Sequence, residues 1–356
     1  MTEKPLILVI NPGSTSTKVA LFKGEEELKE LDISHSTADL AGFHSSLEQL
    51  DFRFRAVEEA LKNWGCQPAD LKAVIGRGGP LKPLAGGVYH VGESLNADLR
   101  SGKLVDHVSV LGGLIACKIA DEAKIPAYIA DPISTDEFTE VARISGSPEL
   151  PRISLVHALN IKAVAAEVAS EEGHKIEDVN YIIAHLGGGF SISPYQKGKL
   201  IDANNANDAG PMSPERCGTV PLQGLLKLCF SGKYQYAELR KKLLGRGGLF
   251  AHLGTSDCRD ISKMIEAGDE KAKLVLEAMA YQIAKEIGAM ATVLKGKVDA
   301  IVLTGGVANN PYVVKWVTER VSFIAPVKVK PGQKELKALA IHATRALAEP
   351  SIVKEY

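Results

Sequence analysis

The chain has 356 residues, with 42 Lys and Arg against 43 Asp and Glu, and a formal net charge of −1 at pH 7. A chain of this length usually exceeds what one hydrophobic core supports, so we expect two domains. Its near-neutral charge offers no long-range attraction to nucleic acid or to an anionic membrane, which argues against both as partners.

The five cysteines are odd in number and form no CxxC pair, a pattern typical of reduced thiols. The N-terminus runs directly into an apolar segment without the features of a secretory leader, and no run of about 18 apolar residues could span a membrane. The nine histidines show no HExxH pattern, which argues against a zinc site made of protein ligands alone. We therefore expect a soluble, cytoplasmic protein.

Short apolar segments rich in β-branched residues alternate with long segments of helical periodicity. This alternation predicts an α/β architecture. In chain order, we expect strands at residues 6–10 and 73–75, helices at 105–123 and 155–169, a strand at 181–184, a helix at 270–294 and a strand at 300–303.

The sequence also resembles itself. VINPGSTSTKVALFKG, from Val9, aligns without gaps with IAHLGGGFSISPYQKG, from Ile183. In the same order, AVIGRGG, from Ala73, aligns with AIVLTGG, from Ala300. The two ordered matches favour an internal duplication, with two similar halves and a ligand-binding cleft between them.

The first turn of this repeat has the composition of a phosphate-binding loop. A strand that turns through Gly13 and hydroxyl residues exposes several backbone N–H groups. Ser14 and Ser16 can add hydroxyl donors, and Lys18 can add a cation. A plain β-hairpin with a Ser/Thr-rich turn would have the same composition.

The second turn, His185 to Gly189, contains three consecutive glycines after an apolar strand. Such a run weakens the fold through backbone entropy and is usually tolerated where the backbone must approach a ligand. Two such turns, one in each half, would hold a polyphosphate from two sides. The sequence has neither GxxxxGK[ST] nor GxGxxG, which excludes a Walker-type NTPase, a Rossmann fingerprint and a protein-kinase glycine loop.

A third motif, LTGGVANNP, begins at Leu303. An apolar strand, the pair Gly305-Gly306, and then Asn310-Pro311 at the start of a helix would suit a flat ring such as adenine, packed on the glycine backbone. An ordinary turn between a strand and a helix, with proline at the first helical position, would have the same pattern.

The motif order NPGSTSTK, IGRGG, LVDH, IADP, AHLGGG, RCGTVP, SDCRD and LTGGVANN resembles the acetate and butyrate kinase family, within the larger group of sugar kinases, chaperone ATPases and actin. The resemblance runs from Ile7 to about Leu347, and NPGSTS and AHLGGGFS are similar to the butyrate kinase branch. It implies the actin/sugar-kinase-like ATPase fold, with two duplicated α/β domains whose mixed β-sheets are flanked by helices. It also implies ATP/ADP and Mg²⁺ as cofactors and at least a homodimer.

The resemblance further implies roles for individual residues. Arg77 and Arg216 would hold the carboxylate substrate and the transferred phosphoryl group, and His157 would stabilise the transition state. His107 would lie near the acyl pocket. Asp131 and Glu335 match acidic residues associated with magnesium, and Asp131 would also take part in catalysis. The cofactor-binding residues would be Asn11, Ser14, Ser16 and Lys18 in the first phosphate loop, His185, Gly187, Gly188 and Gly189 in the second, and Asp257, Arg259, Gly305, Gly306, Val307 and Asn310 around adenosine.

These roles agree with the chemistry of the residue types, although each residue also has an ordinary structural interpretation. Arginine forks match carboxylate and phosphate oxygens, and a carboxylate acceptor needs no general base because it is already deprotonated at pH 7. Arg77 could instead be a surface ion-pair partner, Asp131 the start of a turn, His107 a structural histidine, and Glu335 a first-turn helix acid.

We therefore predict a reversible kinase that phosphorylates a short-chain carboxylic acid, butyrate or a close relative, by direct in-line transfer. The first domain is expected at residues 1–148 with 335–356, and the second at 149–334. The alternatives are the same chemistry on acetate, propionate or a branched acid such as isobutyrate, a sugar kinase, and a nucleotide-regulated ATPase or binding protein.

Overall fold

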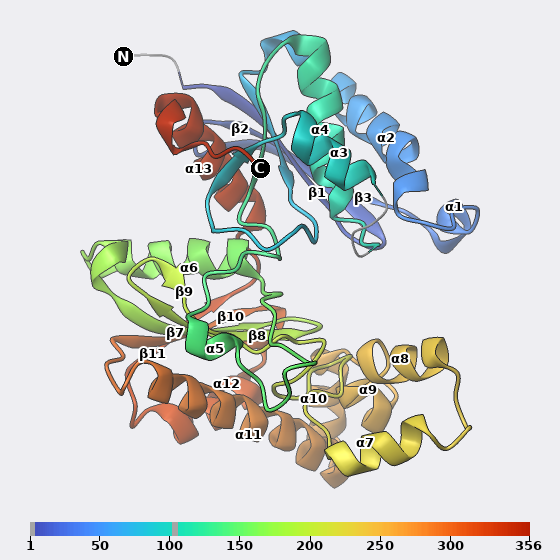
Figure 1. Ribbon diagram of the computed structural model, residues 1–356, viewed down its shortest axis with the longest axis vertical. Helices are drawn as coiled ribbons and strands as arrows, with labels where there is room; N and C mark the ends of the chain where they lie inside the picture. The colour runs from blue at the N-terminus through green and yellow to red at the C-terminus, as the bar shows by residue number, and fades with distance from the viewer. Residues whose placement is uncertain (1–3, 102–105) are drawn as a thin grey trace. The chain divides into compact units, whose positions relative to one another are not determined.

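The computed structural model describes residues 4–101 and 106–356 (Figure 1). By its internal contacts the chain forms two compact units, Met1–Asp136 with Lys334–Tyr356, and Glu137–Gln333. The second unit thus begins at Glu137 rather than at residue 149. The reason is local pairing: the backbone N–H of Thr139 donates to the carbonyl of Ile201 at 3.0 Å, and Glu137 accepts from the N–H of Leu200 at 2.8 Å.

The first unit contains a six-stranded mixed sheet in the order β3-β2-β1-β4-β6-β5. Its strands are β1 (Leu6–Pro12), β2 (Ser16–Lys23), β3 (Glu26–Ser34), β4 (Ala73–Arg77), β5 (Val88–His90) and β6 (Ala127–Ala130). Its helices are α1 (Thr37–Leu40), α2 (Leu50–Asn63), α3 (Glu93–Arg100), α4 (Val110–Ala123) and α13 (Glu335–Ala348).

Helices cover both faces of this sheet, with α2 and α4 on one face and α13 on the other (Figure 1). Successive strand residues point to opposite faces, so Leu8 and Ile10 pack in the core formed with α2 and α4. A side chain at Gly76 would overlap the carbonyl of Gly112, so these two glycines let β4 and α4 approach closely. The alternate residues, including Asn11 and Arg77, are left to face α13.

The second unit contains a five-stranded mixed sheet in the order β11-β10-β7-β8-β9. Its strands are β7 (Asn180–Leu186), β8 (Phe190–Gln196), β9 (Lys199–Leu200), β10 (Ala300–Gly305) and β11 (Val327–Pro331). Its helices are α5 (Glu140–Arg143), α6 (Ala158–Glu171), α7 (Leu222–Cys229), α8 (Tyr236–Leu244), α9 (Gly248–Leu253), α10 (Cys258–Glu266), α11 (Glu270–Val293) and α12 (Pro311–Val321).

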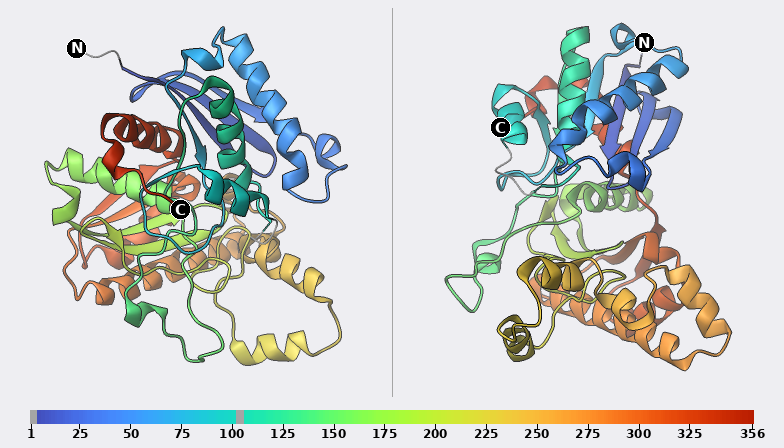
Figure 2. Two further views of the ribbon diagram at one scale, coloured as in Figure 1. Left: turned by 45° about the horizontal axis from the view of Figure 1, so that its top comes forward. Right: turned by 90° about the vertical axis from the view of Figure 1, so that its right-hand side faces the viewer.

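This second sheet is also buried on both faces (Figure 2). Ile182 and Ala184 of β7 pack in the core formed with α11 and α12, whereas Tyr181 and Ile183 pack in the core formed with α6. Burial on both sides explains why β7 reads as a continuous apolar run rather than an alternating one.

The two sheets share one topology, which confirms the predicted duplication. Strands β3-β2-β1-β4-β6 correspond in order and direction to β9-β8-β7-β10-β11. Under the gapless alignment, Pro12 and Leu186 both end their strand, and Ser16 and Phe190 both begin the next. The hairpin registers differ by one residue, because Pro12 pairs with Thr17 whereas Leu186 pairs with Phe190.

The predicted strands all lie within observed strands. The predicted helices at 155–169 and 270–294 correspond to α6 and α11, and that at 105–123 corresponds to α4, although residue 105 lies outside the described residues, as do the first two residues of the LVDH motif. Within residues 4–101 and 106–356, no helix is both long enough and apolar enough to span a membrane.

Candidate active site

The first predicted phosphate loop is the tight turn between β1 and β2. It is closed by a hydrogen bond from the N–H of Gly13 to the carbonyl of Ser16, at 2.8 Å. Ser14 and Thr15 are exposed at its tip. Lys18 follows on β2 with its ammonium 3.9 Å from Asp32, a half-exposed pair that contributes little to stability.

The inner side of this loop is held by a group that the motif analysis missed. Thr17 is buried, and its hydroxyl lies 2.9 Å from Nε2 of His35 and 2.9 Å from Nη1 of Arg53. An arginine can only donate, so the Thr17 oxygen accepts from Arg53. Neutral His35 can then accept the Thr17 hydroxyl proton at Nε2.

Asn11, Arg77 and Glu335 meet at the end of the first sheet, against the start of α13. In the parallel pair β1–β4, Ile10 lies opposite Gly76, so the side chains of the next residues, Asn11 and Arg77, point to the same face of the sheet. Glu335 Oε2 accepts from Asn11 Nδ2 at 2.7 Å and from Arg77 Nη1 at 3.1 Å. The carboxylate is only 3% exposed and lies in the first turn of α13, where the helix dipole favours negative charge.

Asp131, the second acid that the sequence associates with magnesium, has other partners. It follows β6 with a φ of 38° in the left-handed region and is buried. Its Oδ1 accepts from the N–H of Gly87 at 2.8 Å, and its Oδ2 lies 3.0 Å from Nε2 of His342. His342 is on α13, two turns beyond Glu335. Both Asp131 oxygens therefore contact protein groups, one just before β5 and the other on α13.

His107 lies just before α4. Its Nδ1 is 2.6 Å from the hydroxyl of Ser109, the residue that precedes the helix. In the described residues no group of three or more His, Cys, Asp or Glu side chains could hold a metal ion.

In the second unit, His157 and His185 lie together. Their rings stack with centroids 4.1 Å apart and planes inclined by 14°. Nδ1 of His157 is 2.9 Å from the hydroxyl of Ser191, and Nδ1 of His185 is 2.9 Å from Nδ2 of Asn160. An amide nitrogen is a donor, so His185 accepts at Nδ1 and its proton resides on Nε2.

Asn160 of α6 also donates to the hydroxyl of Thr304, at 3.3 Å. In the duplicated topology Asn160, His185 and Thr304 stand where Glu335, Asn11 and Arg77 stand in the first unit: a helix residue and the ends of two adjacent parallel strands. The sequence comparison aligned His185 with Asn11 but gave no signal for Asn160, because its helix lies outside the repeated segments.

The three glycines of the second loop make room for side chains. A Cβ at Gly187 would lie 3.2 Å from Nε2 of His185, and one at Gly188 would lie 3.2 Å from a carboxylate oxygen of Glu215. At Gly189 it would lie 2.5 Å from Nη1 of Arg216. The loop backbone is therefore covered by Arg216, one of the two predicted catalytic arginines.

The Arg216 guanidinium is a partly buried cation. Burial lowers its pKa, the charge of Glu215 raises it, and the charge of Arg240 lowers it. The segment that carries it is tied to the glycine loop, because Ser213 donates its hydroxyl to the carbonyl of Gly188 at 2.6 Å. An arginine whose side-chain N–H groups have no acceptor among the described residues is suited to bind an anion.

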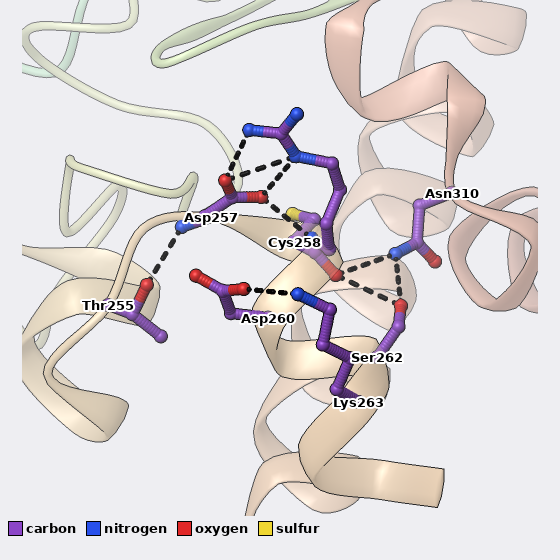
Figure 3. Close-up of polar contacts among 8 residues, drawn as sticks. Thr255, Asp257, Cys258, Asp260, Ser262, Lys263 and Asn310 are labelled. Carbon is purple, nitrogen blue, oxygen red and sulfur yellow. Dashed lines mark hydrogen bonds and ion pairs between the residues drawn. The ribbon is translucent and has the colours of Figure 1, made fainter.

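In the predicted adenosine region, Asp257 and Asn310 each cap a helix (Figure 3). Asp257 caps α10 by accepting from the N–H of Arg259 at 2.8 Å, and its carboxylate also pairs with the largely exposed Arg259 side chain at 2.6 Å. Asn310 caps α12 and donates to the carbonyl of Cys258 at 3.1 Å and the hydroxyl of Ser262 at 2.8 Å (Figure 3). These contacts join α10 to α12.

The two glycines of the third motif differ. Gly305 has a φ of 88°, and a side chain there would overlap the backbone of Leu186. In the part of the chain that the structure describes, nothing lies within 4 Å of the Cβ position of Gly306, and Val307 is buried beside it. This leaves a flat glycine surface of the kind that can pack against an adenine ring.

We expect Gly189→Ala to displace Arg216 without unfolding the protein. The added methyl group meets the guanidinium, and the loss of one donor from a developing charge typically lowers kcat about 100-fold or more. Steady-state kinetics and circular dichroism measure the two effects. Gly288→Ala is the matched control, because Gly288 lies in α11 and no described residue has an atom within 4 Å of its Cβ position apart from the backbone of its own helix and its chain neighbours. Equal kcat in the two variants would contradict the assignment.

The buried His35 should make the first unit less stable in mild acid. Burial lowers its pKa, Arg53 lowers it further, and Asp39 and Asp32 raise it. Between its lowered folded pKa and the unfolded value near 6.5, the unfolded chain binds more protons. The free energy of unfolding therefore falls as the pH is lowered through the unfolded pKa and towards the lowered folded pKa.

Tryptophan fluorescence can measure this dependence in the first unit, because the chain has two tryptophans, Trp64 and Trp316, and only Trp64 lies in that unit. In a Trp316→Phe background, urea unfolding should show that acid lowers the free energy of unfolding less for His35→Gln than for the chain that keeps His35. Glutamine keeps an oxygen acceptor for Thr17. The same pH slope with and without His35 would show that other groups cause the loss.

Comparison with known proteins gives matches by sequence. A model of the acetokinase family matches residues 155–336. A protein of Caldanaerobacter subterraneus subsp. tengcongensis named "Probable butyrate kinase 2" is 49% identical over 350 residues, which cover 98% of this chain and 99% of that protein.

Solved structures give a likeness of fold. The acetate kinase of Porphyromonas gingivalis has a TM-score of 0.78 at 20% identity, over 97% of this chain and 100% of that chain. A propionate kinase from Francisella tularensis subsp. tularensis has a TM-score of 0.75 at 18% identity, over 95% of this chain and 98% of that chain. The predicted fold class, with two duplicated α/β domains, is confirmed.

Proposed function

Because the chain belongs to the acetokinase family, we propose that it transfers the terminal phosphoryl group of ATP to a short-chain carboxylic acid, giving ADP and an acyl phosphate. The family predicted from the motifs is thereby confirmed, and the chain is a phosphotransferase with a carboxylate acceptor. The observation that carries this function is 49% identity, over nearly the whole of both chains, to a protein named as a butyrate kinase.

Arg77 has the geometry to bind the carboxylate substrate. Its contacts with Glu335 and Asn11 both use Nη1. Among the described residues no other group bonds this guanidinium, so Nε and Nη2 remain for a two-point interaction with a carboxylate. Glu335 holds the arginine in place, and the side chain keeps 20% of its surface exposed. The substrate carboxylate attacks as the anion, so no general base is required.

In the second unit we assign the phosphoryl group to Arg216, His157 and His185. Phosphoryl transfer depends mainly on positioning and on the stabilisation of charge. The partly buried Arg216 guanidinium beside Gly189 is a donor that can stabilise charge on the phosphoryl group, and its shielding from water strengthens that interaction. The His157 ring stacks on His185 and fixes its orientation.

We assign the magnesium side of the site to Glu335 alone. Both of its described partners contact Oε2, so Oε1 remains for a cation, whereas both oxygens of Asp131 have protein partners. A single carboxylate suits Mg²⁺, which usually keeps water and phosphate oxygens as its other ligands. When bound with ATP, the ion would neutralise charge on the phosphates.

Butyrate is the acceptor that we propose, and its support is the name of the relative at 49% identity. One methylene group changes binding by only about 1–3 kcal/mol, so acids one carbon shorter or longer should also react. We place the reaction in the cytoplasm, in keeping with the reduced cysteines expected from the sequence.

The hydroxylamine–ferric assay for acyl phosphate tests this function. Purified protein with Mg-ATP should give acyl phosphate from acids of three to five carbons, most rapidly from butyrate. The rates with acetate, propionate and isobutyrate rank the alternative acids. Glycerol and glucose, with ADP release as the readout, are the controls for a sugar kinase. ADP release only with a polyol, or without any acceptor, would overturn the proposal.

We also propose that the protein is a homo-oligomer. Helix α7 has no buried residue, and Leu222, Leu226 and Phe230 are 71%, 50% and 87% exposed. Large apolar side chains gathered on one helix are typical of a protein–protein interface. Light scattering of the purified chain should give at least twice the mass of one chain, and Phe230→Asp should lower it. A monomeric native protein would contradict the proposal.

A further inference from the structure

Arg53 is a charged side chain in the core of the first unit. It lies on α2 among Phe54, Val57 and Leu61, and it is fully buried, with 0% of its surface exposed. Burial lowers its pKa to about 10, so it still carries its charge at neutral pH. No carboxylate among the described residues pairs with it. A buried, unpaired charge is costly to the fold unless other groups solvate it.

The groups that solvate Arg53 are backbone carbonyls of the first phosphate loop. Nη1 donates to the carbonyl of Gly13 at 2.9 Å and to that of Ser16 at 2.8 Å. Nη2 donates to the carbonyl of Ser14 at 3.1 Å. The guanidinium is itself held from the other side, because Nε donates to Gln49 Oε1 at 3.0 Å.

The remaining carbonyl of the loop is held in the same way. The backbone N–H of His35, just after β3, donates to the carbonyl of Thr15 at 2.8 Å. All four carbonyls of residues 13–16 therefore accept from groups inside the first unit.

This arrangement fixes where the N–H groups of the loop point. A peptide unit is planar with its C=O and N–H on opposite sides, so a carbonyl held inward turns the next N–H outward. Ser14 and Thr15 are exposed, and within residues 4–101 and 106–356 neither amide N–H donates to a protein acceptor. Successive outward N–H groups form a concave anion-binding surface.

We propose that Arg53 is a positioning residue for phosphate binding, which turns the peptide units after Gly13 and Ser14 so that the N–H groups of Ser14 and Thr15 face the nucleotide phosphates. The inference rests on the proposed function of this loop. Arg53 itself does not touch the ligand, but its positive charge beneath the loop also adds to the attraction for polyphosphate. If Arg53 served only the stability of the core, its replacement would change the free energy of unfolding and leave phosphate binding unchanged.

The preference for ATP over adenosine separates these two roles, because adenosine has no phosphates. We expect Arg53→Met, of similar length but without charge or donors, to weaken ATP binding about 100-fold and adenosine binding less than about 3-fold, by isothermal titration calorimetry. Arg53→Lys keeps the charge but offers one ammonium in place of the planar fork, so it should restore part of the preference.

Leu61→Ala is the matched control. Leu61 is buried on the same helix, two turns beyond Arg53, and packs in the hydrophobic core of the first unit. The variant should lower the unfolding temperature but keep the native preference for ATP. If Arg53→Met does not fold, Arg53→Lys and Gln49→Leu, which removes the support of Nε, carry the test with smaller expected losses of about 10-fold and 3-fold.

The outcomes distinguish a failure of this inference from a failure of the proposed function on which it rests. If the native chain binds adenosine as tightly as ATP, or forms no acyl phosphate, the proposed function is overturned. If the native chain prefers ATP and the folded Arg53 variants keep that preference, with KM for ATP unchanged, the positioning role of Arg53 is overturned and the function stands.

Discussion

The first unit depends on the buried carboxylate of Glu335. It ties α13 to Asn11 and Arg77, which lie 324 and 258 positions away in the chain. Removing a carboxylate from water costs several kcal/mol, which is offset only when donors are well placed and a partner charge is close. The ends of two adjacent parallel strands and the first turn of a helix meet those requirements. The strand that leads into the first predicted phosphate loop and the side chain of Arg77 are consequently held by one interaction.

The second unit repeats this arrangement with uncharged groups. Asn160, His185 and Thr304 occupy the equivalent helix and strand positions, and no charge balance is needed there. Duplication has thus produced two polar clusters from one topology. The first combines an arginine with a carboxylate and suits an anionic acid beside a cation. The second sets the proton of a histidine on Nε2, next to a loop that Arg216 covers.

The two glycine-containing turns obtain their positive charge in different ways. In the second turn, glycines leave space for the Arg216 guanidinium against the backbone. In the first turn, the Arg53 guanidinium lies beneath the loop and binds its carbonyls. The sequence contains a signal for Arg53, since it occupies the core-facing stripe of α2 with Val57 and Leu61. A charged residue on such a stripe indicates a special partner but does not identify it.

The sequence alone determined the alternation of strands and helices, the internal repeat and the order of the motifs, and from these the fold class, the family and the chemistry. Periodicity, glycine turns and motif spacing are local or one-dimensional properties, so they can be read without coordinates. Only the tertiary structure decided that the second unit begins at Glu137, that Asp131 pairs with His342, and that Arg53 and Asn160 support the two loops. Those contacts depend on strand register and helix packing between residues far apart in the chain, which no local pattern encodes.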